Sequence, residues 1–260
     1  MNKAKKSLGQ HWLDDEFILV EIVRIAGVQA GDTVLEVGPG HGTLTKKLCQ
    51  AGANVVAIEK DEALADQLIF QQLSKDLRII KGDVLGYDLI SLPPNYKVVA
   101  NIPYYLTSNL LRVLSESKNP PSTVTLLVQK EVAERVCAEP GQMSILGVSA
   151  QFYYDCQLGI VVPAAKFTPP PKVDSRVIHM VRKSEKNNMN TKQFFRVVKA
   201  GFSARRKTLH NSLAGGLNMP KNEVLSLLEK SQIPPSTRPQ ELSLEQWIKL
   251  ASIIHHSLQT

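Results

Sequence analysis

The chain has 260 residues, of which 43% are hydrophobic and 21% are charged, and its formal net charge is +7. Its length allows one large domain and a smaller one, and it has no uninterrupted apolar stretch long enough to span a bilayer. The lysine-rich start runs into polar residues instead of the apolar region of a signal peptide, so we expect a cytoplasmic protein without a membrane segment.

The cysteines show no disulfide or metal pattern. Cys49, Cys137 and Cys156 are odd in number and lie far apart in the sequence. Small buried thiols that stay reduced are typical of such spacing, so we expect neither a disulfide nor a metal site.

The positive charge is concentrated in the C-terminal part of the chain. Residues 183–260 hold 12 Lys and Arg against 5 Asp and Glu, whereas residues 1–182 hold 19 of each. This asymmetry predicts two domains, one over residues 1–182 for small-molecule chemistry and one over residues 183–260 that meets a polyanion such as nucleic acid.

The first part of the chain predicts an alternation of strands and helices. A basic arm leads into an amphipathic helix, in which apolar residues recur at helical spacing over residues 17–25. We then predict buried strands over residues 33–37, 54–58, 77–80, 97–100 and 124–128. Helical stretches separate these strands, which indicates an α/β fold with a doubly wound, mostly parallel sheet and right-handed crossovers.

A glycine-rich turn at residues 38–42 follows the first of these strands. Its Gly-x-Gly-x-Gly spacing differs from the dinucleotide-binding pattern, and Pro39 removes one of the N–H donors that a pyrophosphate would use. The phosphate-free nucleoside S-adenosylmethionine fits better. Glu59 and Asp83 follow the next two strands, where they can accept hydrogen bonds from ribose hydroxyls and from the adenine amino group.

The stretch around Asn101 follows another buried strand and suits a nucleobase. Pro103 disfavours helical geometry at Ile102, which leaves the Ile102 carbonyl beside the Asn101 side chain. These two acceptors can face one amino group, and Tyr104 offers a flat apolar face.

Residues 149–162 and 176–181 predict two antiparallel strands that close the sheet edge. Three consecutive prolines stiffen the loop between them and can hold Phe167 in a fixed place. Polar residues 183–191 read as a linker.

The remainder of the chain is helical by pattern. Gly215-Gly216 and Pro234-Pro235 are predicted to separate the helices, and Ser243 with Gln246 forms a capping box for the last one.

Seven segments, taken in order, resemble the small-subunit type of ribosomal RNA adenine dimethyltransferase. They are residues 8–13, 36–42, 59–61, 82–83, 101–104, 167–175 and 202–209. The resemblance covers nearly the whole chain. Trp12 departs from it, because the family usually has Phe there, and the larger aromatic changes the local packing.

The resemblance implies a doubly wound sheet with an antiparallel edge strand and a small all-α C-terminal domain. It implies transfer of methyl groups from S-adenosylmethionine to N6 of two adjacent adenosines near the 3′ end of small-subunit ribosomal RNA, giving dimethyladenosines. The implied partner is that RNA or the pre-ribosomal subunit, and the protein is expected to be a monomer.

The resemblance also assigns residues. The cofactor would be held by Gln10, His11, Leu13, Glu36, Gly38, Gly40, Glu59, Asp83, Val84 and Asn101. The catalytic set that grips the target base would be Asn101, Ile102, Pro103 and Tyr104, with Phe167 stacked on the other face of the base. The cations expected to meet RNA are Lys3, Lys5, Lys6, Arg205, Arg206 and Lys207.

Three alternatives stay open at this point. A large-subunit methyltransferase of the macrolide-resistance type shares the catalytic segments, although residues 205–209 favour the small-subunit type. A non-catalytic RNA-binding assembly or transcription factor could use the same fold, but the intact Glu59, Asp83 and Asn101 argue against it. A nicotinamide-dependent dehydrogenase is the remotest.

Overall fold

The computed structural model describes residues 9–184, 189–204 and 206–257. The chain divides into two compact units, Met1–Glu134 with Tyr154–Arg182 and Arg135–Tyr153 with Lys183–Thr260. The predicted boundary after residue 182 coincides with one boundary of these units. Residues 135–153, which we placed in the first domain, belong instead with the C-terminal helices.

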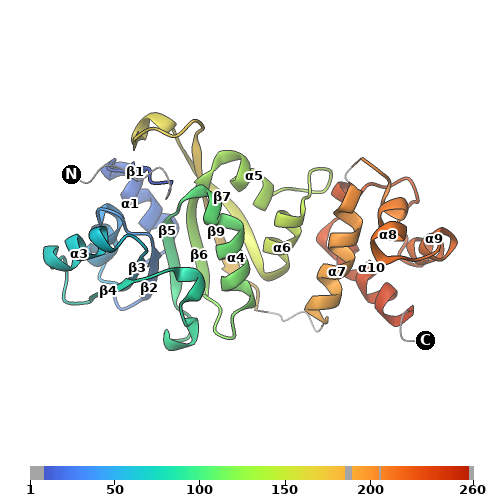
Figure 1. The fold of residues 1–260 in the computed structure, drawn as a ribbon, viewed down its shortest axis with the longest axis horizontal. Helices are drawn as coiled ribbons and strands as arrows, with labels where there is room; N and C mark the ends of the chain where they lie inside the picture. Colours follow the sequence, from blue (N-terminus) through green and yellow to red (C-terminus); the bar gives the residue numbers. More distant parts are fainter. Residues whose placement is uncertain (1–8, 185–188, 205, 258–260) are drawn as a thin grey trace. The chain divides into compact units, whose positions relative to one another are not determined.

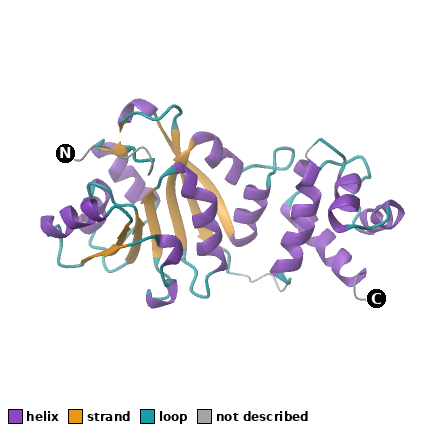
Figure 2. Ribbon diagram, in the orientation of Figure 1, coloured by secondary structure: helices purple, strands orange, loops and turns teal. Residues whose placement is uncertain are grey.

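The first unit is built on a seven-stranded sheet with the order β4-β3-β2-β5-β6-β9-β7 (Figures 1 and 2). The five strands from β4 to β6 are parallel, which confirms the predicted α/β fold. The sheet strands are β2 (Thr33–Val37), β3 (Asn54–Glu59), β4 (Leu77–Lys81), β5 (Lys97–Asn101), β6 (Thr123–Gln129), β7 (Tyr154–Val162) and β9 (Ser175–Arg182).

The antiparallel pair that closes the sheet edge is present as predicted, but its first strand begins later than expected. Strand β9 is antiparallel to both β6 and β7, so the predicted antiparallel pair is present. Within this pair, β9 lies next to β6 and β7 forms the edge of the sheet. The edge strand starts later than predicted, since residues 149–153 complete a helix before β7 begins at Tyr154.

Helices pack on the sheet through their apolar faces, which removes those faces from water. The helices of this unit are α1 (Glu16–Ile25), α2 (Thr43–Gln50), α3 (Glu62–Gln71), α4 (Thr107–Glu116) and, ending in the second unit, α5 (Lys130–Val136). Ile18 and Ile22 of α1 and Leu48 of α2 share one core cluster with Val34 and Val55 of the sheet. Asp15 begins α1 by accepting a hydrogen bond from the Ile18 N–H.

A separate two-stranded sheet joins the N-terminal segment to the proline-rich loop. Its strands, β1 (Trp12–Leu13) and β8 (Phe167–Thr168), are antiparallel, with Leu13 opposite Phe167. This pairing brings residues that are more than 150 positions apart in sequence together beside the main sheet.

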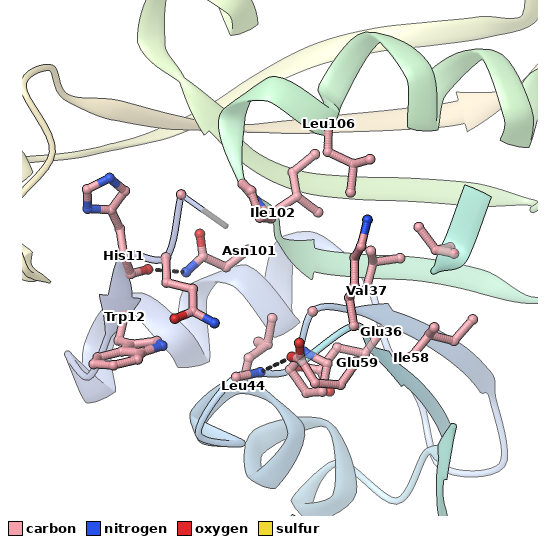
Figure 3. Close-up of a pocket in the computed structure, with 18 of the residues that line it drawn as sticks. His11, Trp12, Glu36, Val37, Leu44, Ile58, Glu59, Asn101, Ile102 and Leu106 are labelled. Atoms are coloured by element: carbon pink, nitrogen blue, oxygen red, sulfur yellow. Dashed lines mark hydrogen bonds between the residues drawn. The ribbon is translucent and has the colours of Figure 1, made fainter. Parts of the chain in front are cut away.

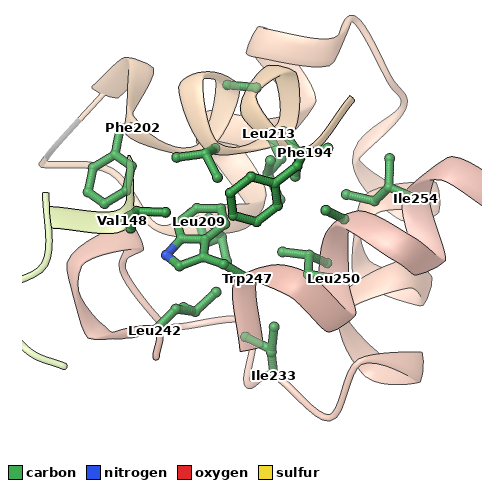
Figure 4. Packing of buried hydrophobic residues seen from close by; sticks show 14 of the residues in the cluster. Val148, Phe194, Phe202, Leu209, Leu213, Ile233, Leu242, Trp247, Leu250 and Ile254 are labelled. Atoms are coloured by element: carbon green, nitrogen blue, oxygen red, sulfur yellow. The ribbon is translucent and has the colours of Figure 1, made fainter. Parts of the chain in front are cut away.

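The second unit is helical and has its own core. Its helices are α6 (Ile145–Tyr153), α7 (Thr191–Gly201), α8 (Leu209–Leu217), α9 (Lys221–Lys230) and α10 (Leu244–Ser257). Trp247 is fully buried among them, packed with Phe194, Leu209 and Leu213 (Figure 4). Val148 and Phe152 of α6 belong to the same cluster, which explains why residues 135–153 leave the first unit.

Two local predictions for this unit have opposite outcomes. The capping box of α10 is confirmed, because the Ser243 N–H donates to Gln246 Oε1 and the Gln246 N–H donates to Ser243 Oγ. The prediction that Gly215 and Gly216 separate helices is wrong, since both lie inside α8. A Cβ on Gly216 would approach Ala200 of α7 to 2.7 Å, so this glycine lets the two helices pack closely.

Short 3₁₀ turns fill several connections. They are Val84–Gly86, Leu89–Ser91, Tyr104–Leu106, Ala164–Lys166, Phe202–Ala204 and Pro239–Glu241.

Candidate functional site

A pocket of about 190 Å³ lies in the first unit, where the parallel strands end. Residues at the carboxyl ends of β2, β3 and β5 line it together with the segment after β4. Strand order reverses between β2 and β5, and such switch points are where open α/β sheets bind ligands. Side chains from these strand ends and from the N-terminal segment lie around one space in Figure 3.

The structure brings nearly all the predicted site residues to this pocket. Those that line it are Gln10, His11, Leu13, Glu36, Gly38, Gly40, Glu59, Asp83, Val84, Asn101, Ile102, Pro103 and Tyr104. The convergence follows from the parallel strands, because their carboxyl ends meet along one edge of the sheet.

The glycine turn shapes one wall of the pocket. Gly38, Gly40 and Gly42 have φ values of 66°, 59° and 79°, a conformation that residues with a Cβ rarely adopt. A Cβ on Gly42 would meet Leu68 at 2.5 Å, so this glycine is needed for packing. A Cβ on Gly38 would point into open space, which leaves room for a ligand.

Glu59 is held rigidly at the end of β3. Its carboxylate accepts hydrogen bonds from the N–H of Gly40 at 3.0 Å and from the N–H of Asp61 at 2.8 Å. Burial raises the pKa of the Glu59 carboxyl, and these two N–H donors oppose that shift. The side chain is therefore fixed in the position from which it can accept further hydrogen bonds.

Asp83 is also fixed by hydrogen bonds, one of them from Lys60, which the sequence analysis did not single out. Its Oδ1 accepts from the Leu85 N–H at 3.0 Å, and its Oδ2 is 2.8 Å from Lys60 Nζ. The Lys60 ammonium lowers the pKa of the Asp83 carboxyl, which keeps it an ionised acceptor. Lys60 directly follows Glu59, but in the sequence nothing distinguishes it from a solvated surface lysine.

Glu36 is the most buried carboxyl group of the pocket wall. It is 1% exposed, and within the described residues its Oε2 has no hydrogen-bond partner. Burial raises its pKa from 4.5 to about 8, with the nearby Glu59 charge adding to the shift. An orphaned carboxyl oxygen in a pocket wall suits a cationic or hydroxyl-bearing ligand.

Asn101 has its side-chain amide oriented by the N-terminal segment. Its Nδ2 donates to the main-chain oxygen of His11 at 3.3 Å, as the dashed line in Figure 3 shows. Because the amide N–H₂ is engaged there, Oδ1 is left as the acceptor. Ile102, the next residue, is 2% exposed and lines the same pocket.

Tyr104 is held by one contact at its hydroxyl and another at its ring. Its hydroxyl lies 2.8 Å from the Oγ of Ser175, a fully buried residue at the start of β9. The His11 ring stacks on it with centroids 5.9 Å apart and an interplanar angle of 23°. His11 Nδ1 also lies 2.7 Å from the carbonyl oxygen of Pro169. The sequence analysis did not identify Ser175 as a partner, because it lies 71 positions from Tyr104.

Phe167 is the exception among the predicted catalytic residues. It is 3% exposed, lies opposite Leu13 in the β1–β8 pair, and belongs to the core cluster beside the sheet. Among the described residues it does not line the pocket. Phe167 is therefore buried in this structure, and its stacking on a base stays a prediction.

The predicted RNA-binding cations are only partly visible. Lys3, Lys5, Lys6 and Arg205 lie outside the described residues, whereas Arg206 and Lys207 are exposed.

Over residues 9–184, 189–204 and 206–257, no group of His, Cys, Asp or Glu side chains could hold a metal ion. In the same ranges, none of the helices has the length and apolar character needed to cross a membrane.

Comparison with known proteins gives consistent results. The family model described as Ribosomal RNA adenine dimethylase matches residues 1–256. The ribosomal RNA small subunit methyltransferase A of Dehalococcoides mccartyi is 41% identical over 254 residues, which cover 95% of this chain and 87% of the relative. The protein of the same name from Thermosynechococcus vestitus is 40% identical over 267 residues, covering 100% of both chains.

Solved structures agree in fold. A dimethyladenosine transferase from Plasmodium falciparum is 26% identical with a TM-score of 0.79, covering 92% of this chain and 96% of that one. The 23S rRNA methyltransferase ErmE has a TM-score of 0.76 at 24% identity, covering 94% of this chain and 99% of that one. The second likeness shows the shared fold alone.

Proposed function

The chain belongs to the ribosomal RNA adenine dimethylase family, whose members use S-adenosylmethionine, and on that premise we propose its substrate and the roles of its residues. The proposed reaction is dimethylation of N6 on two adjacent adenosines near the 3′ end of small-subunit ribosomal RNA. The names of the relatives that are about 40% identical over nearly the whole chain support this choice of subunit.

One observation supports the catalytic assignment above the others. At the end of β5, the Asn101 amide is turned so that its N–H₂ faces His11 and its Oδ1 remains an acceptor in the pocket. An acceptor at this place, beside the Ile102 carbonyl, can bind both hydrogens of an adenine amino group.

The pocket also fits the cofactor. Gly38 leaves open space where a Cβ would stand, and Glu36 offers an orphaned oxygen. We assign Glu59, whose carboxylate is held by the Gly40 N–H, to the ribose hydroxyls. When bound, S-adenosylmethionine supplies a methyl group on a positively charged sulfur. Gln10, whose Nε2 lies 3.4 Å from Asp61 Oδ2, would hold the methionine portion with the glycine turn.

The protein contributes geometry to the reaction instead of a strong base. Adenine N6 is a poor nucleophile because its lone pair is delocalised into the ring. By accepting the amino hydrogens, Asn101 Oδ1 and the Ile102 carbonyl draw N6 toward tetrahedral geometry and localise that lone pair. Holding both reactants in line contributes up to roughly 7–11 kcal/mol to lowering the barrier. Stacking on Tyr104 offsets about 1–3 kcal/mol of the cost of taking the base out of its stack.

Isotope-labelled methyl transfer tests the proposed function. Small and large ribosomal subunits that lack the modification are incubated separately with labelled S-adenosylmethionine, and their RNA is analysed by mass spectrometry. We expect dimethyladenosine in small-subunit RNA, because one remaining N6 hydrogen still finds an acceptor in the second round. Label in large-subunit RNA alone would favour the macrolide-resistance type, and RNA binding without transfer would favour a non-catalytic factor.

The hydrogen bond between Ser175 and Tyr104 is expected to position the base-stacking ring. We predict that Ser175→Ala lowers kcat up to about tenfold, the loss expected from one buried hydrogen bond, while cofactor affinity stays unchanged. Tyr104→Phe removes the same bond from the other side. The double variant should therefore be no slower than the slower single variant, as measured by single-turnover transfer.

Ser115→Ala is the matched control, since Ser115 is also a buried serine of the first unit and donates to Leu111 O. It should leave kcat unchanged. Additive losses in the Ser175 and Tyr104 variants would show that the hydroxyl pair does not act as a unit.

We further propose that the basic second unit docks on RNA and that the protein works as a cytoplasmic monomer on pre-ribosomal subunits. Arg205, Arg206 and Lys207 are three consecutive cations, of which the two described ones are exposed. Replacing all three by Gln should flatten the slope of log affinity against log salt by about 2–3, with cofactor affinity unchanged. An unaltered slope in RNA-binding titrations would refute their docking role.

A further inference from the structure

Helix α7 presents a row of cations on the side opposite its buried face. Lys192, Arg196 and Lys199 are exposed, while Phe194 and Val198 lie in the core of the second unit. At 3.6 residues per turn, spacings of four and three place the cations within about 60° of one another around the helix axis. We call these three side chains the α7 cationic face.

The surrounding sequence offers no compensating charge. Residues 189–222 contain seven Lys and Arg and no Asp or Glu. Among the ion pairs between residues that the structure describes, none includes Lys192, Arg196 or Lys199. The face therefore presents unpaired positive charge.

Of the three cations only Lys199, in the last turn, is favoured by the helix dipole, and two other features of the arrangement lower the stability of the helix. Lys192 with Arg196 and Arg196 with Lys199 are like-charge neighbours, each destabilising by a few tenths of a kcal/mol. Lys192 also stands in the first turn, where the helix dipole favours acids, and that turn has none. Helix α9, by contrast, mixes Glu223 and Glu229 with its two lysines, as an ordinary solvated face does.

We propose that the α7 cationic face binds the phosphate backbone of the ribosomal RNA substrate, as a contact additional to residues 205–207. The inference rests on the proposed function, which supplies a polyanion. The first and last of these cations are seven residue steps apart, or about 10 Å along the helix axis, so the three can contact several phosphates of one strand. Lys and Arg contacts of this kind position RNA without reading its sequence.

The test compares two triple variants of the full-length protein that lose the same charge from the same unit. The test variant carries Lys192→Gln, Arg196→Gln and Lys199→Gln. The control variant carries Lys221→Gln, Lys230→Gln and Lys249→Gln, which are exposed positions on α9 and α10. Affinity for protein-free small-subunit ribosomal RNA is titrated at several salt concentrations, and methyl transfer to undermethylated small subunits is measured alongside.

We expect the test variant to flatten the slope of log affinity against log salt by about 2–3, because each lost phosphate contact removes about 0.7–0.9. The control should flatten it by less than about 1. Maximal transfer at saturating substrate should not change, and the melting temperature of the test variant should stay equal or rise, because like-charge repulsion is relieved.

An unchanged slope in the test variant, or an equal change in the control, would overturn the inference. Weaker binding to intact subunits with unchanged binding to protein-free RNA would mean that a ribosomal protein covers the face, which also contradicts it. If the test variant melts lower than the wild type, a second variant that keeps the charge, Lys192→Arg with Lys199→Arg, is measured. It should bind RNA as tightly as the wild type does, and weaker RNA binding by this variant would refute the RNA contact. Failure of the wild type to methylate small subunits would instead refute the proposed function.

Discussion

Asn101→Ala is expected to abolish methyl transfer, with a rate loss of at least about a hundredfold, while S-adenosylmethionine binds nearly as before. A preorganised hydrogen-bonding group at a reacting centre is worth about that much. The Asn101 side chain is assigned chiefly to the acceptor base, whereas Glu59 and Asp83 hold the cofactor through separately fixed carboxylates. Single-turnover transfer and calorimetry with the cofactor measure the two effects independently.

Asn101→Asp separates the acceptor from its orientation. It keeps the size and the acceptor oxygens, but it sets a carboxylate oxygen against the His11 carbonyl oxygen, where Nδ2 now donates at 3.3 Å. We expect this variant to lose most activity as well, because the repulsion turns the side chain away. Near-normal turnover in the alanine variant would contradict the catalytic assignment, and normal turnover in the aspartate variant would show that His11 does not orient the amide.

Parallel topology explains why most of the pocket was predictable. Residues that follow successive buried strands must meet at one edge of the sheet, so Glu59, Asp83 and Asn101 could be grouped from the sequence alone. The glycine turn was predictable for a related reason, because left-handed backbone at Gly38, Gly40 and Gly42 leaves few other residue choices.

Contacts between distant segments were not predictable. The fate of Phe167 depends on its pairing with Leu13, and the orientation of Tyr104 depends on Ser175, and neither pairing leaves a periodic signal in the sequence. Gly216 was misread for the same reason. A glycine inside a helix resembles a helix end until the neighbouring helix, whose Ala200 it admits, is known.

Glu36→Gln is expected to stabilise the cofactor-free protein at neutral and alkaline pH. Burial raises the pKa of Glu36 from 4.5 in its ordinary state to about 8 in the folded chain. Between these values the folded state holds a proton that the unfolded state has lost, so stability falls as pH rises from about 4.5 and levels off above about 8. Glutamine cannot ionise and escapes this loss.

The gain should therefore depend on pH in a defined way. The melting temperature of Glu36→Gln should equal that of the wild type near pH 4 and exceed it by several degrees above pH 8, since the penalty is on the order of a few kcal/mol. Taking the difference between variant and wild type cancels the other titrating groups. Glu131→Gln, which changes an exposed carboxylate of the same unit, should show no such growth with pH.

The same substitution should weaken cofactor binding, because a carboxyl group that is costly to bury is retained where it has a use. Calorimetry in two buffers of different ionisation enthalpy can follow this: if a positively charged portion of S-adenosylmethionine draws Glu36 into its ionised form, binding at pH 7 releases a proton in the wild type and none in Glu36→Gln. Equal affinity and equal proton release in both proteins would place Glu36 outside the cofactor site. A melting-temperature difference that stays constant from pH 5 to pH 9 would show that its carboxyl group does not titrate in this range, and that its burial serves packing alone.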